Sequence, residues 1–566
     1  MASRGAIPAR AVLLPCAIAA LLCLRGLPET VAHPDQMAFL SLFKPDKAPF
    51  NPGWFEKPPF HTYFHFFLSE GPVSLLGLPP DVAERWRTLW SKLLQVMLFA
   101  GSVAVLHAIL RRVARGTVAL AIATLFATSA GMVAHAHFLT ADVAVTFWML
   151  LAFLFCQRLF ERGRWQDYAA AGLLTGIAAA TKYNGIGVGI AIPVAHAARW
   201  LLQQPRPSPA RAAISPQLIL GLALVGVGFV AANPFALLDF QTFFADFVYN
   251  SKVAPVYEGQ TGHSYGRFFA ALGETIGPPL ALIAGAAGVW SCMRSRSPRN
   301  PRTATVWMAV TVLALYYAKF APFPRLENRF VLPIAPYLLV LATPAIDELA
   351  RRARVAAWVG FAGLLIYNLA CSYIVGGRFL ADPRVTAAAA LQSGIPRNAS
   401  VEADIYSAGL FPSDFCCVTP MPFLTGRERL FNRLFAGDES VTGPPEAQVR
   451  EERLLPWFTG EALAARQPYY IVTNSNFYGR FQGAGDRARL YPEVRAYFSQ
   501  LLSGRLGYTV IVDQRALSAP CWAYPQNIDF LDNRLVVLKS DAMPMGTPVR
   551  SAAHASRNQS PSATSR

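Results

Sequence analysis

Residues 93–136 read LLQVMLFAGSVAVLHAILRRVARGTVALAIATLFATSAGMVAHA. Two apolar runs, each near the roughly 20 residues that a helix needs to cross a bilayer, flank a short connection that holds Arg111, Arg112 and Arg115. The pattern recurs along the first two thirds of the 566-residue chain, of which 53% is hydrophobic and only 15% is charged. These features exclude a disordered chain, a coiled coil and a collagen-like fibre. They predict a protein that crosses a membrane many times as α-helices.

The apolar runs predict eleven membrane spans. They are placed at residues 11–27, 84–110, 117–136, 141–160, 167–182, 184–202, 216–238, 266–290, 303–320, 330–348 and 354–375. The first run could be mistaken for a secretory signal. It has no clear small-residue cleavage site before Pro28, so we expect it to be retained as a span.

The arginines between the spans predict the topology. With the N-terminus inside, every second connection is short and basic, as the positive-inside rule requires. The inside connections hold Arg111, Arg112 and Arg115; Arg158, Arg162 and Arg164; Arg199, Arg206 and Arg211; Arg294, Arg296, Arg299 and Arg302; and Arg351, Arg352 and Arg354. The outside connections are 28–83, 137–141, the turn near 183, 239–265, 321–329 and the chain after 376. The net charge of +17 therefore reflects topology, and we exclude a nucleic-acid surface, which would interleave basic and aromatic residues on one soluble face.

The sequence divides into three parts. Residues 1–378 form the expected transmembrane domain, and its first outer loop, 28–83, includes an apolar portion, 60–80, that we expect to lie along the membrane surface. Residues 379–548 alternate strand-like runs with helical stretches and predict an α/β domain on the outer side. The tail 549–566 is rich in Ser, Ala and Arg and is expected to be disordered.

The C-terminal domain carries its own strand signals and cysteines. The strand-like runs are 469–472, 508–512 and 535–538. Cys416, Cys417 and Cys521 allow one disulfide, whose pairing the sequence does not decide. The other cysteines lie in or beside apolar runs, where they are expected to be core residues, and no metal-ligand spacing occurs.

Two carboxylates are predicted at the outer mouth of the helix bundle, where polar groups are costly unless they are paired or used. Asp35 follows the first span, and Asp142 opens the fourth. Together they suit a general base and a group that orients substrate or metal. Asp142 could instead cap the first amides of its helix, and Asp35 could be an ordinary loop residue.

Cations accompany these carboxylates on the predicted outer side. Lys57 follows Glu56 in a Pro-rich segment and suits a lipid-linked phosphate, although a solvated ion pair with Glu56 is the alternative. Lys182 ends a span and either extends to the surface or binds the same phosphate. Arg329 lies near Arg325 and Glu327, so some of these three side chains are expected to pair with one another.

The order of these motifs resembles a known family over about residues 10–400. The motifs are Asp35 after the first span, Glu56-Lys57-Pro58-Pro59, Asp142 opening a span, Thr181-Lys182 closing a span, Asn233-Pro234-Phe235 with Asp239, Arg329-Phe330 with Pro333, and Asp382-Pro383-Arg384. This order resembles the GT-C membrane glycosyltransferases. It is most similar to the protein O-mannosyltransferase-like group, which includes the bacterial aminoarabinose transferases to lipid A.

The resemblance implies a polytopic helical fold and an inverting glycosyltransferase that takes a sugar from a polyprenyl-phosphate donor. The acceptor would be a hydroxyl of a protein, lipid A or a glycan on the extracytoplasmic face. By match to the family's first-loop motif, Asp35 would be the general base. The implied donor-phosphate residues are Lys57, Asp142, Lys182 and Arg329.

A divalent metal is also implied, because it occurs in some relatives. Glu56 and His263 would be the matching positions, although a lone loop histidine such as His263 is more often a surface residue. One departure is plain: the family often has Asp-Glu in the first loop, and here the pair is Asp35-Gln36. Gln36 cannot act as a base, which weakens any metal role of that position.

Three other functions compete with this interpretation. A transporter or flippase of lipid-linked sugars usually has internal repeats and polar residues near the bilayer midplane, whereas here they gather at the outer ends. A non-catalytic scaffold would tolerate replacement of Asp35 and Lys57. A polymerase or ligase that uses a diphosphate-linked donor would carry Arg-rich outer loops. Arginine far outnumbers lysine, which favours a bacterial inner membrane with the C-terminal domain in the periplasm.

Overall fold

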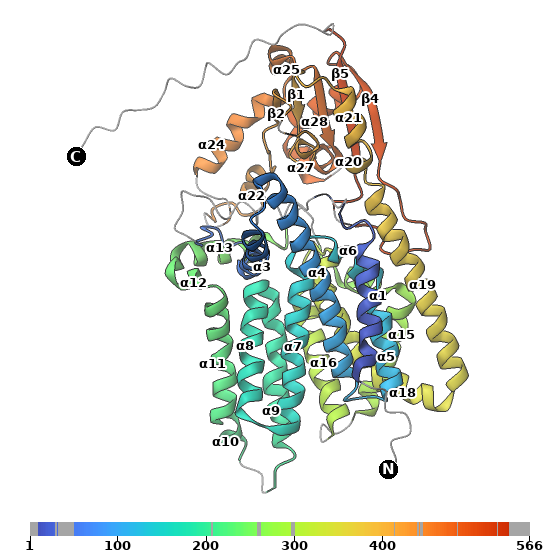
Figure 1. The fold of residues 1–566 in the computed structure, drawn as a ribbon. Coiled ribbons are helices and arrows are strands. Elements are labelled where there is room, and N and C mark those ends of the chain that lie inside the picture. The colour runs from blue at the N-terminus through green and yellow to red at the C-terminus, as the bar shows by residue number, and fades with distance from the viewer. Residues whose placement is uncertain are drawn as a thin grey trace, which may run out of the picture. The chain divides into compact units, whose positions relative to one another are not determined.

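The computed structural model describes residues 9–28, 31, 50–204, 208–256, 262–295, 300–412, 414–438, 441, 445–483, 485–528 and 530–542. The chain forms two compact units (Figure 1). The first, which we call the membrane unit, comprises Met1–Val385, Phe431–Thr442 and Ala516–Asp532. The second, the sheet unit, comprises Thr386–Leu430, Gly443–Arg515 and Asn533–Arg566. The predicted tail at 549–566 lies outside the described residues.

The membrane unit is built from helices. In chain order they are η1 (Ala9–Val12), α1 (Leu13–Leu24), α3 (Phe60–Leu76), α4 (Pro80–Leu110), α5 (Gly116–Ala127), α6 (Ala130–Ala136), α7 (Ala141–Arg162), α8 (Trp165–Thr181), η2 (Tyr183–Ile190), α9 (Ala191–Trp200), α10 (Pro209–Ala213), α11 (Pro216–Ala232), α12 (Phe235–Leu238), α13 (Phe240–Val253), α14 (Tyr265–Ile276), α15 (Pro278–Arg294), α16 (Pro301–Phe320), α17 (Asn328–Val331), η3 (Leu332–Ile334), α18 (Ala335–Arg352), α19 (Arg354–Leu380) and α20 (Pro383–Thr386).

Each predicted span coincides with a helical element, but not all of these elements are long. Among the described residues, six helices are long and apolar enough to cross a membrane, or eight if each of two bent pairs counts as one span. The predicted spans 11–27, 167–182 and 184–202 correspond to α1, α8 and η2 with α9, which are individually shorter than the 18 residues of that criterion. The chain is therefore an integral membrane protein, and the count of eleven spans stays a prediction.

Two predicted spans are bent rather than straight. The span at 117–136 is divided into α5 and α6, which meet at 55°, and the span at 266–290 into α14 and α15, which meet at 117°. At the second bend Gly277 has φ +98°, a conformation that glycine adopts at no steric cost, and Pro278 and Pro279 follow it. Because proline has no N–H and fixes φ, it suits the first turn of the new helix.

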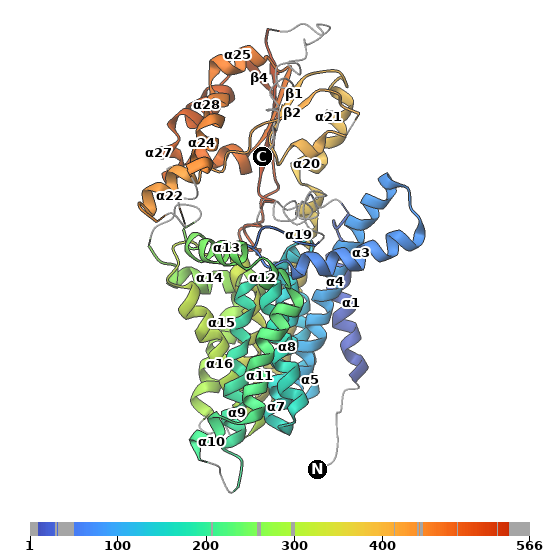
Figure 2. The same ribbon diagram turned by 90° about the vertical axis from the view of Figure 1, so that its left-hand side faces the viewer.

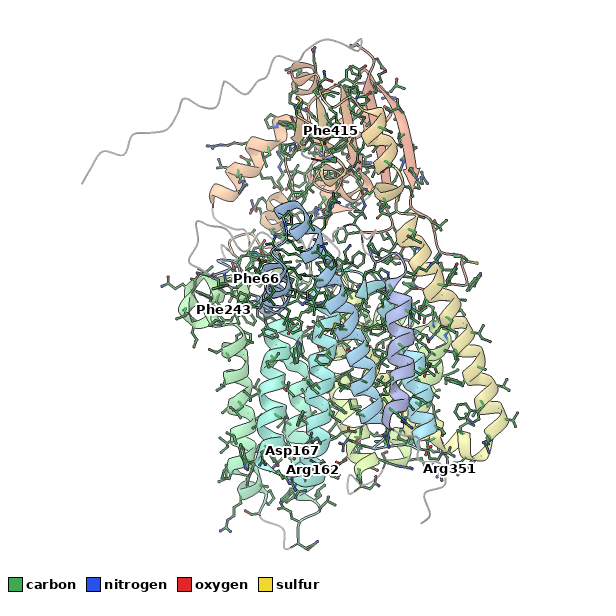
Figure 3. The ribbon with its side chains drawn as sticks, viewed as in Figure 1. Phe66, Arg162, Asp167, Phe243, Arg351 and Phe415 are labelled. Atoms are coloured by element: carbon green, nitrogen blue, oxygen red, sulfur yellow. A yellow bond between two sulfur atoms is a disulfide. The ribbon has the colours of Figure 1, made fainter. Side chains whose placement is uncertain are left out.

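The two ends of the membrane unit differ in composition. Arg162, Asp167 and Arg351 lie together at one end, which we call the arginine end, whereas Phe66 and Phe243 lie at the opposite end (Figure 3). At the arginine end the fully buried Asp347 accepts a 2.7 Å hydrogen bond from Nε of Arg115 and lies 3.6 Å from Arg302. These two contacts connect the starts of α5 and α16 to α18.

Short helices cover the opposite end. Figure 2 shows α3 crosswise to the long helices of the bundle. The segment before α3 is anchored at both sides, because Oη of Tyr63 donates to the Phe50 carbonyl (2.7 Å) and Nδ2 of Asn51 donates to Asp239 (3.1 Å). Exposed aromatic rings of α13, including the stacked pair Phe240 and Phe244, add to this aromatic layer.

The sheet unit contains a five-stranded mixed sheet in the order β2-β1-β3-β5-β4. Its strands are β1 (Val401–Ala403), β2 (Val418–Pro420), β3 (Tyr470–Asn474), β4 (Tyr508–Arg515) and β5 (Arg534–Ser540). The strand β1 is parallel to β2 and β3, whereas β5 is antiparallel to β3 and β4. The strand-like runs in the sequence lie in β3, β4 and β5. Every residue of β3 is buried, as expected for a central strand covered on both faces.

Helices surround this sheet. They are α21 (Ala388–Gly394), η4 (Ala408–Leu410), α22 (Glu428–Leu434), α24 (Pro445–Leu454), η5 (Leu455–Phe458), α25 (Gly460–Arg466), α26 (Ser475–Tyr478), η6 (Gly479–Phe481), α27 (Asp486–Leu490) and α28 (Pro492–Leu502). Of the three cysteines whose pairing was open, Cys416 and Cys417 are bonded to each other and Cys521 is not in a disulfide.

Candidate functional site

A buried ion pair joins two predicted site residues at the end opposite the arginines. Nζ of Lys182 donates a 2.5 Å hydrogen bond to Oδ1 of Asp142. Asp142 is the second residue of α7 and is buried, whereas Lys182 directly follows α8 with an extended backbone. The N-cap position of α7 is held by Thr140, so the alternative that Asp142 occupies the cap is wrong.

Further basic side chains gather around this pair. Arg329, at the start of α17, and His135, in α6, lie close enough to Asp142 to act on its carboxylate electrostatically. Glu327 accepts from Arg325 and from Arg329, as the sequence predicted for these neighbours. Among the described residues, the cluster brings Lys182, Arg325 and Arg329 together with Asp142 and Glu327.

Phe330 holds two of these cations over its ring. Nζ of Lys182 is 5.4 Å from the ring centroid, and Cζ of Arg325 is 5.8 Å from it. Both distances fall within the range of cation–π attraction. The ring therefore brings Lys182, from the end of α8, and Arg325, from the connection before α17, to one place. Basic side chains with several N–H donors at one place are suited to an anionic ligand.

A pair of uncharged histidines lies on the buried face of α3. The rings of His61 and His65 are 4.4 Å apart, and both side chains are buried. Burial lowers the pKa of His61 to about 4, although the charge of Asp142 acts in the opposite direction. His61 is therefore neutral at neutral pH and adds no charge to the cluster.

The segment with Glu56 and Lys57 is fixed by its neighbour Phe55. The Phe55 amide donates to Oδ2 of Asp246 (2.6 Å), and its carbonyl accepts from Oη of Tyr183 (2.6 Å), the residue after Lys182. Burial, and then the charges of Glu56 and Asp239, raise the pKa of Asp246. Lys57 is half-buried two residues beyond Phe55. The loop is thus tied both to α13 and to the end of α8.

Comparison with known proteins gives one match in sequence. Residues 87–241 match the family model described as dolichyl-phosphate-mannose-protein mannosyltransferase. This segment contains Asp142, Lys182 and Asn233, but neither Lys57 nor Arg329. No curated protein matches the chain significantly.

Solved structures extend the likeness to the whole chain. Apo ArnT from Cupriavidus metallidurans matches with a TM-score of 0.52 and 14% identity over 93% of this chain and 97% of that one. The chain has a GT-C fold. ArnT bound to undecaprenyl phosphate matches with a TM-score of 0.48, 14% identity and coverage of 94% and 98%. Oligosaccharyltransferase AglB from Archaeoglobus fulgidus matches with a TM-score of 0.49, 13% identity and coverage of 90% and 80%. The resemblance to GT-C glycosyltransferases is confirmed.

Neither of the metal ligands implied by the GT-C resemblance belongs to a metal-binding group in the described part of the chain. His263 is exposed, and its ring lies 4.4 Å from that of Tyr265. Glu56 instead acts on Asp246. Within the residues that the structure describes, no group of three or more His, Cys, Asp or Glu side chains is placed to hold a metal ion. We therefore derive no step through a metal.

The predicted base Asp35, together with Gln36, lies outside the described residues. Of the predicted donor-phosphate residues, the structure brings Asp142, Lys182 and Arg329 together. Two residues of the site were missed in the sequence, His61 and Asp246. Their signal was the pattern of isolated polar residues in otherwise aromatic stretches, FHTYFHFF and FQTFFADF, which is typical of a helix with one polar face.

Proposed function

We propose that the chain is an integral-membrane glycosyltransferase that moves a sugar from a polyprenyl-phosphate donor to an acceptor hydroxyl. The observation that carries the proposal is the buried Asp142–Lys182 pair with Arg329 beside it, at the end opposite the arginines. Two of these residues lie in the segment that matches the mannosyltransferase family model, whose description names a lipid-phosphate sugar. The N–H donors of Lys182 and Arg329 suit the phosphate of such a donor.

The phosphate is the group that leaves, so its growing charge must be stabilised. Lys182 has three N–H donors, and Asp142 takes one of them. Asp142 therefore fixes the direction of the ammonium rather than touching the phosphate, while Lys182 and Arg329 offer N–H groups to the phosphate oxygens. Lys57 is the third candidate for this role. In a partly dry site these contacts strengthen as the sugar–oxygen bond breaks.

The acceptor supplies the nucleophile in this proposal. Its hydroxyl oxygen attacks the anomeric carbon, the lipid phosphate departs with the bonding electrons, and Asp35 takes the hydroxyl proton. Direct displacement inverts the configuration of that carbon.

The proposed location follows from the side on which the cluster lies. The arginine end would face the cytoplasm by the positive-inside rule, which places the cluster on the extracytoplasmic face. We propose a bacterial inner membrane, with the sheet unit in the periplasm and a protein, lipid A or a glycan as acceptor. A donor with a polar head and a long apolar tail requires a site at the membrane boundary, where the aromatic layer of α3 and α13 lies.

The test uses the full chain purified in detergent, with a panel of polyprenyl-monophosphate sugars and a mixed acceptor extract. Released lipid phosphate is measured for the wild type, Asp35→Asn, Lys57→Ala and the matched control Arg302→Ala at the arginine end. We expect turnover by the wild type and the control, and its loss in Asp35→Asn with folding intact. Turnover that survives in Asp35→Asn would discard this base while keeping the enzyme.

The alternative of a transporter or flippase is favoured by one observation, the two bent helix pairs, since broken helices are common in transporters. Movement of a fluorescent lipid-linked sugar across liposomes that contain the protein distinguishes the two functions. Flipping without release of lipid phosphate from any donor would replace the proposed function with transport.

A further inference from the structure

Residues 516–532 connect two neighbouring strands of the sheet unit but belong to the membrane unit. The strand β4 ends at Arg515 and β5 begins at Arg534. Antiparallel neighbours need only a short hairpin turn between them, so a long excursion into another unit requires its own explanation. We call this segment the strap. Neither the fold of the sheet nor the proposed chemistry uses it.

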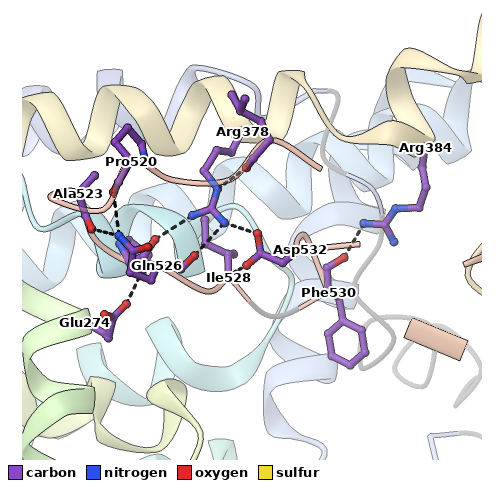
Figure 4. A network of polar contacts seen from close by, with 11 residues as sticks. Glu274, Arg378, Arg384, Pro520, Ala523, Gln526, Ile528, Phe530 and Asp532 are labelled. Atoms are coloured by element: carbon purple, nitrogen blue, oxygen red, sulfur yellow. Dashed lines mark hydrogen bonds and ion pairs between the residues drawn. The ribbon is translucent and has the colours of Figure 1, made fainter. Parts of the chain in front are cut away.

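A buried arginine satisfies the backbone of the strap. Arg378, near the end of α19, donates to the carbonyls of Leu517 (3.2 Å), Pro525 (2.8 Å) and Gln526 (3.1 Å), and it pairs with Asp532 (Figure 4). Irregular backbone can lie at membrane depth only where its polar groups are satisfied by the protein. Arg378 donates hydrogen bonds to three strap carbonyls, which would otherwise need water as their partner.

Tyr524 of the strap packs against both helix bends, the one between α5 and α6 and the one between α14 and α15. Oη of Tyr524 accepts from the first amide of α6, at Ala130 (3.2 Å), and donates to Oδ1 of Asn368 in α19 (2.7 Å). A Cβ at Gly277, the other bend, would lie only 2.9 Å from the Tyr524 ring. Asn368 in turn donates to the Leu125 carbonyl at the end of α5 (3.2 Å). The strap is thus an integral part of the membrane unit.

Exposed apolar residues occur both on α19 and on the strap that packs beside it. Those of α19 are Val355, Val359, Ile366 and Tyr373, whose spacing puts them on one helix face. Leu517 and Trp522 of the strap are 54% and 53% exposed. Oη of Tyr367 donates to the Trp522 carbonyl (2.9 Å), and the two rings lie 6.4 Å apart. Trp522 therefore lies against α19, which is an apolar span by length and composition.

We propose that the strap lies in the interfacial layer of the bilayer, with Leu517 and Trp522 in contact with lipid. Three observations favour lipid over a protein partner: the contact of the strap with α19, an apolar span, the preference of Trp for the membrane interface, and a backbone satisfied from within by Arg378. The proposal depends on the chain being a membrane protein and not on the proposed sugar transfer.

Cys521 provides a probe inside the strap, because it is exposed and not in a disulfide. The full chain is reconstituted in nanodiscs of phosphatidylethanolamine and phosphatidylglycerol and labelled with a nitroxide at Cys521. The Cys521→Ser variant gives the signal from labelling elsewhere. Leu517→Cys in that background gives a second strap position. Ile511→Cys in β4, an exposed aliphatic residue of the sheet unit, is the matched control.

The readout is the accessibility of each label to oxygen, which concentrates in lipid, and to a water-soluble nickel chelate. We expect oxygen accessibility to exceed chelate accessibility at both strap positions, and the reverse at the control. Chelate accessibility at the strap equal to that at the control would place the strap in water and overturn the proposal. Protection of both strap labels from both reagents would show a protein partner or a second copy on this face, and would overturn it equally.

Discussion

Asp347 and Asp142 are two buried carboxylates, each surrounded by cations, that lie at opposite ends of the membrane unit. Asp347 binds Arg115 three times, through the Arg115 amide (3.3 Å), through Nε (2.7 Å), and from Nη2 to the Asp347 carbonyl (2.9 Å). Asp142 accepts one hydrogen bond from Lys182. The side chains of Arg115 and Arg302 are 43% and 50% exposed, whereas those of Lys182 and Arg329 are 25% and 12% exposed.

We interpret this difference as one of role: the Asp347 contacts hold helices together, whereas the Asp142 contacts belong to a ligand-binding site. Arg115 directs its donors to Asp347, and the rest of its side chain is exposed to solvent. This pair therefore holds helices together. At Asp142 the cations are more buried and Lys182 has donors to spare. A buried ion pair is often no more stabilising than apolar packing, because desolvation offsets the attraction. We infer that the Asp142 pair is kept for a ligand, and the following predictions test that distinction.

The largest effect is expected from Lys182→Met, which keeps much of the side-chain length and removes the charge. Transfer from the lipid-phosphate donor should fall at least about 100-fold, a loss of about 2.7 kcal/mol in transition-state stabilisation. Steady-state kinetics of released lipid phosphate measure it. The matched variant Arg302→Met at the arginine end should keep its activity within about twofold. Equal losses in the two variants would contradict the distinction.

Asp347→Asn should act on stability instead. It removes the carboxylate that Arg115 and Arg302 contact, and because both arginines are about half exposed, the expected cost is that of lost hydrogen bonds to a charged group, about 2 kcal/mol. Thermal unfolding in detergent should therefore shift to lower temperature, while the activity per folded molecule stays near that of the wild type. Asp142→Asn provides the reciprocal test. We expect its activity per folded molecule to fall strongly, while its unfolding temperature changes less than that of Asp347→Asn. A variant of Asp347 that folds normally but is inactive would show that Asp347, like Asp142, is needed for activity, and would contradict the structural role given to it.

Arg329→Lys retains the charge but loses the planar fork of donors. A lysine cannot contact Glu327 and a phosphate in the same geometry. We expect the KM for the donor to rise about tenfold with a smaller change in kcat, since the lost contact is made already in the ground state. An unchanged KM would remove Arg329 from the phosphate site.

The smallest effect at neutral pH is expected from His61→Asn, because His61 is already uncharged there. Its pKa is lowered by burial from 6.5 to about 4, so the unfolded chain binds the proton more readily. The contribution of neutral His61 to stability is complete above pH 6.5 and is lost as the pH falls toward 4. His61→Asn should therefore change activity at pH 7 less than about twofold, and it should flatten the fall in stability between pH 6.5 and 4. An unchanged pH profile of unfolding would refute this.

The sequence predicted which residues share an end of the bundle better than it predicted their contacts. Asp142, Lys182 and Arg329 were placed on one side because apolar run lengths and arginine clusters determine where each span ends. Their assembly into one cluster depends on how α7, α8 and α17 pack, which no local pattern encodes. Asp35 remains a prediction on its motif alone, as it lies outside the described residues.

The helix bends and the strap were not predicted from the sequence. Gly277 with the two prolines after it was a visible signal for a break, whereas the residues between α5 and α6, Thr128 and Ser129, are weak breakers. The strap had no signal, because the partners of Arg378 lie about 140–150 residues away along the chain. Ion pairs of this sequence separation follow from tertiary packing alone.

Tyr524 and Ala130 are separated by 394 residues, and this separation has a consequence for biosynthesis. The ribosome adds about 5–20 residues per second, so α6 waits about 20–80 s for the hydroxyl that pairs with its first amide. During that interval the break between α5 and α6 lacks this acceptor, although both helices have already left the ribosome. The membrane unit is therefore completed only after residue 524 has been synthesised, and a nascent chain that ends before residue 516 carries an unfinished bend.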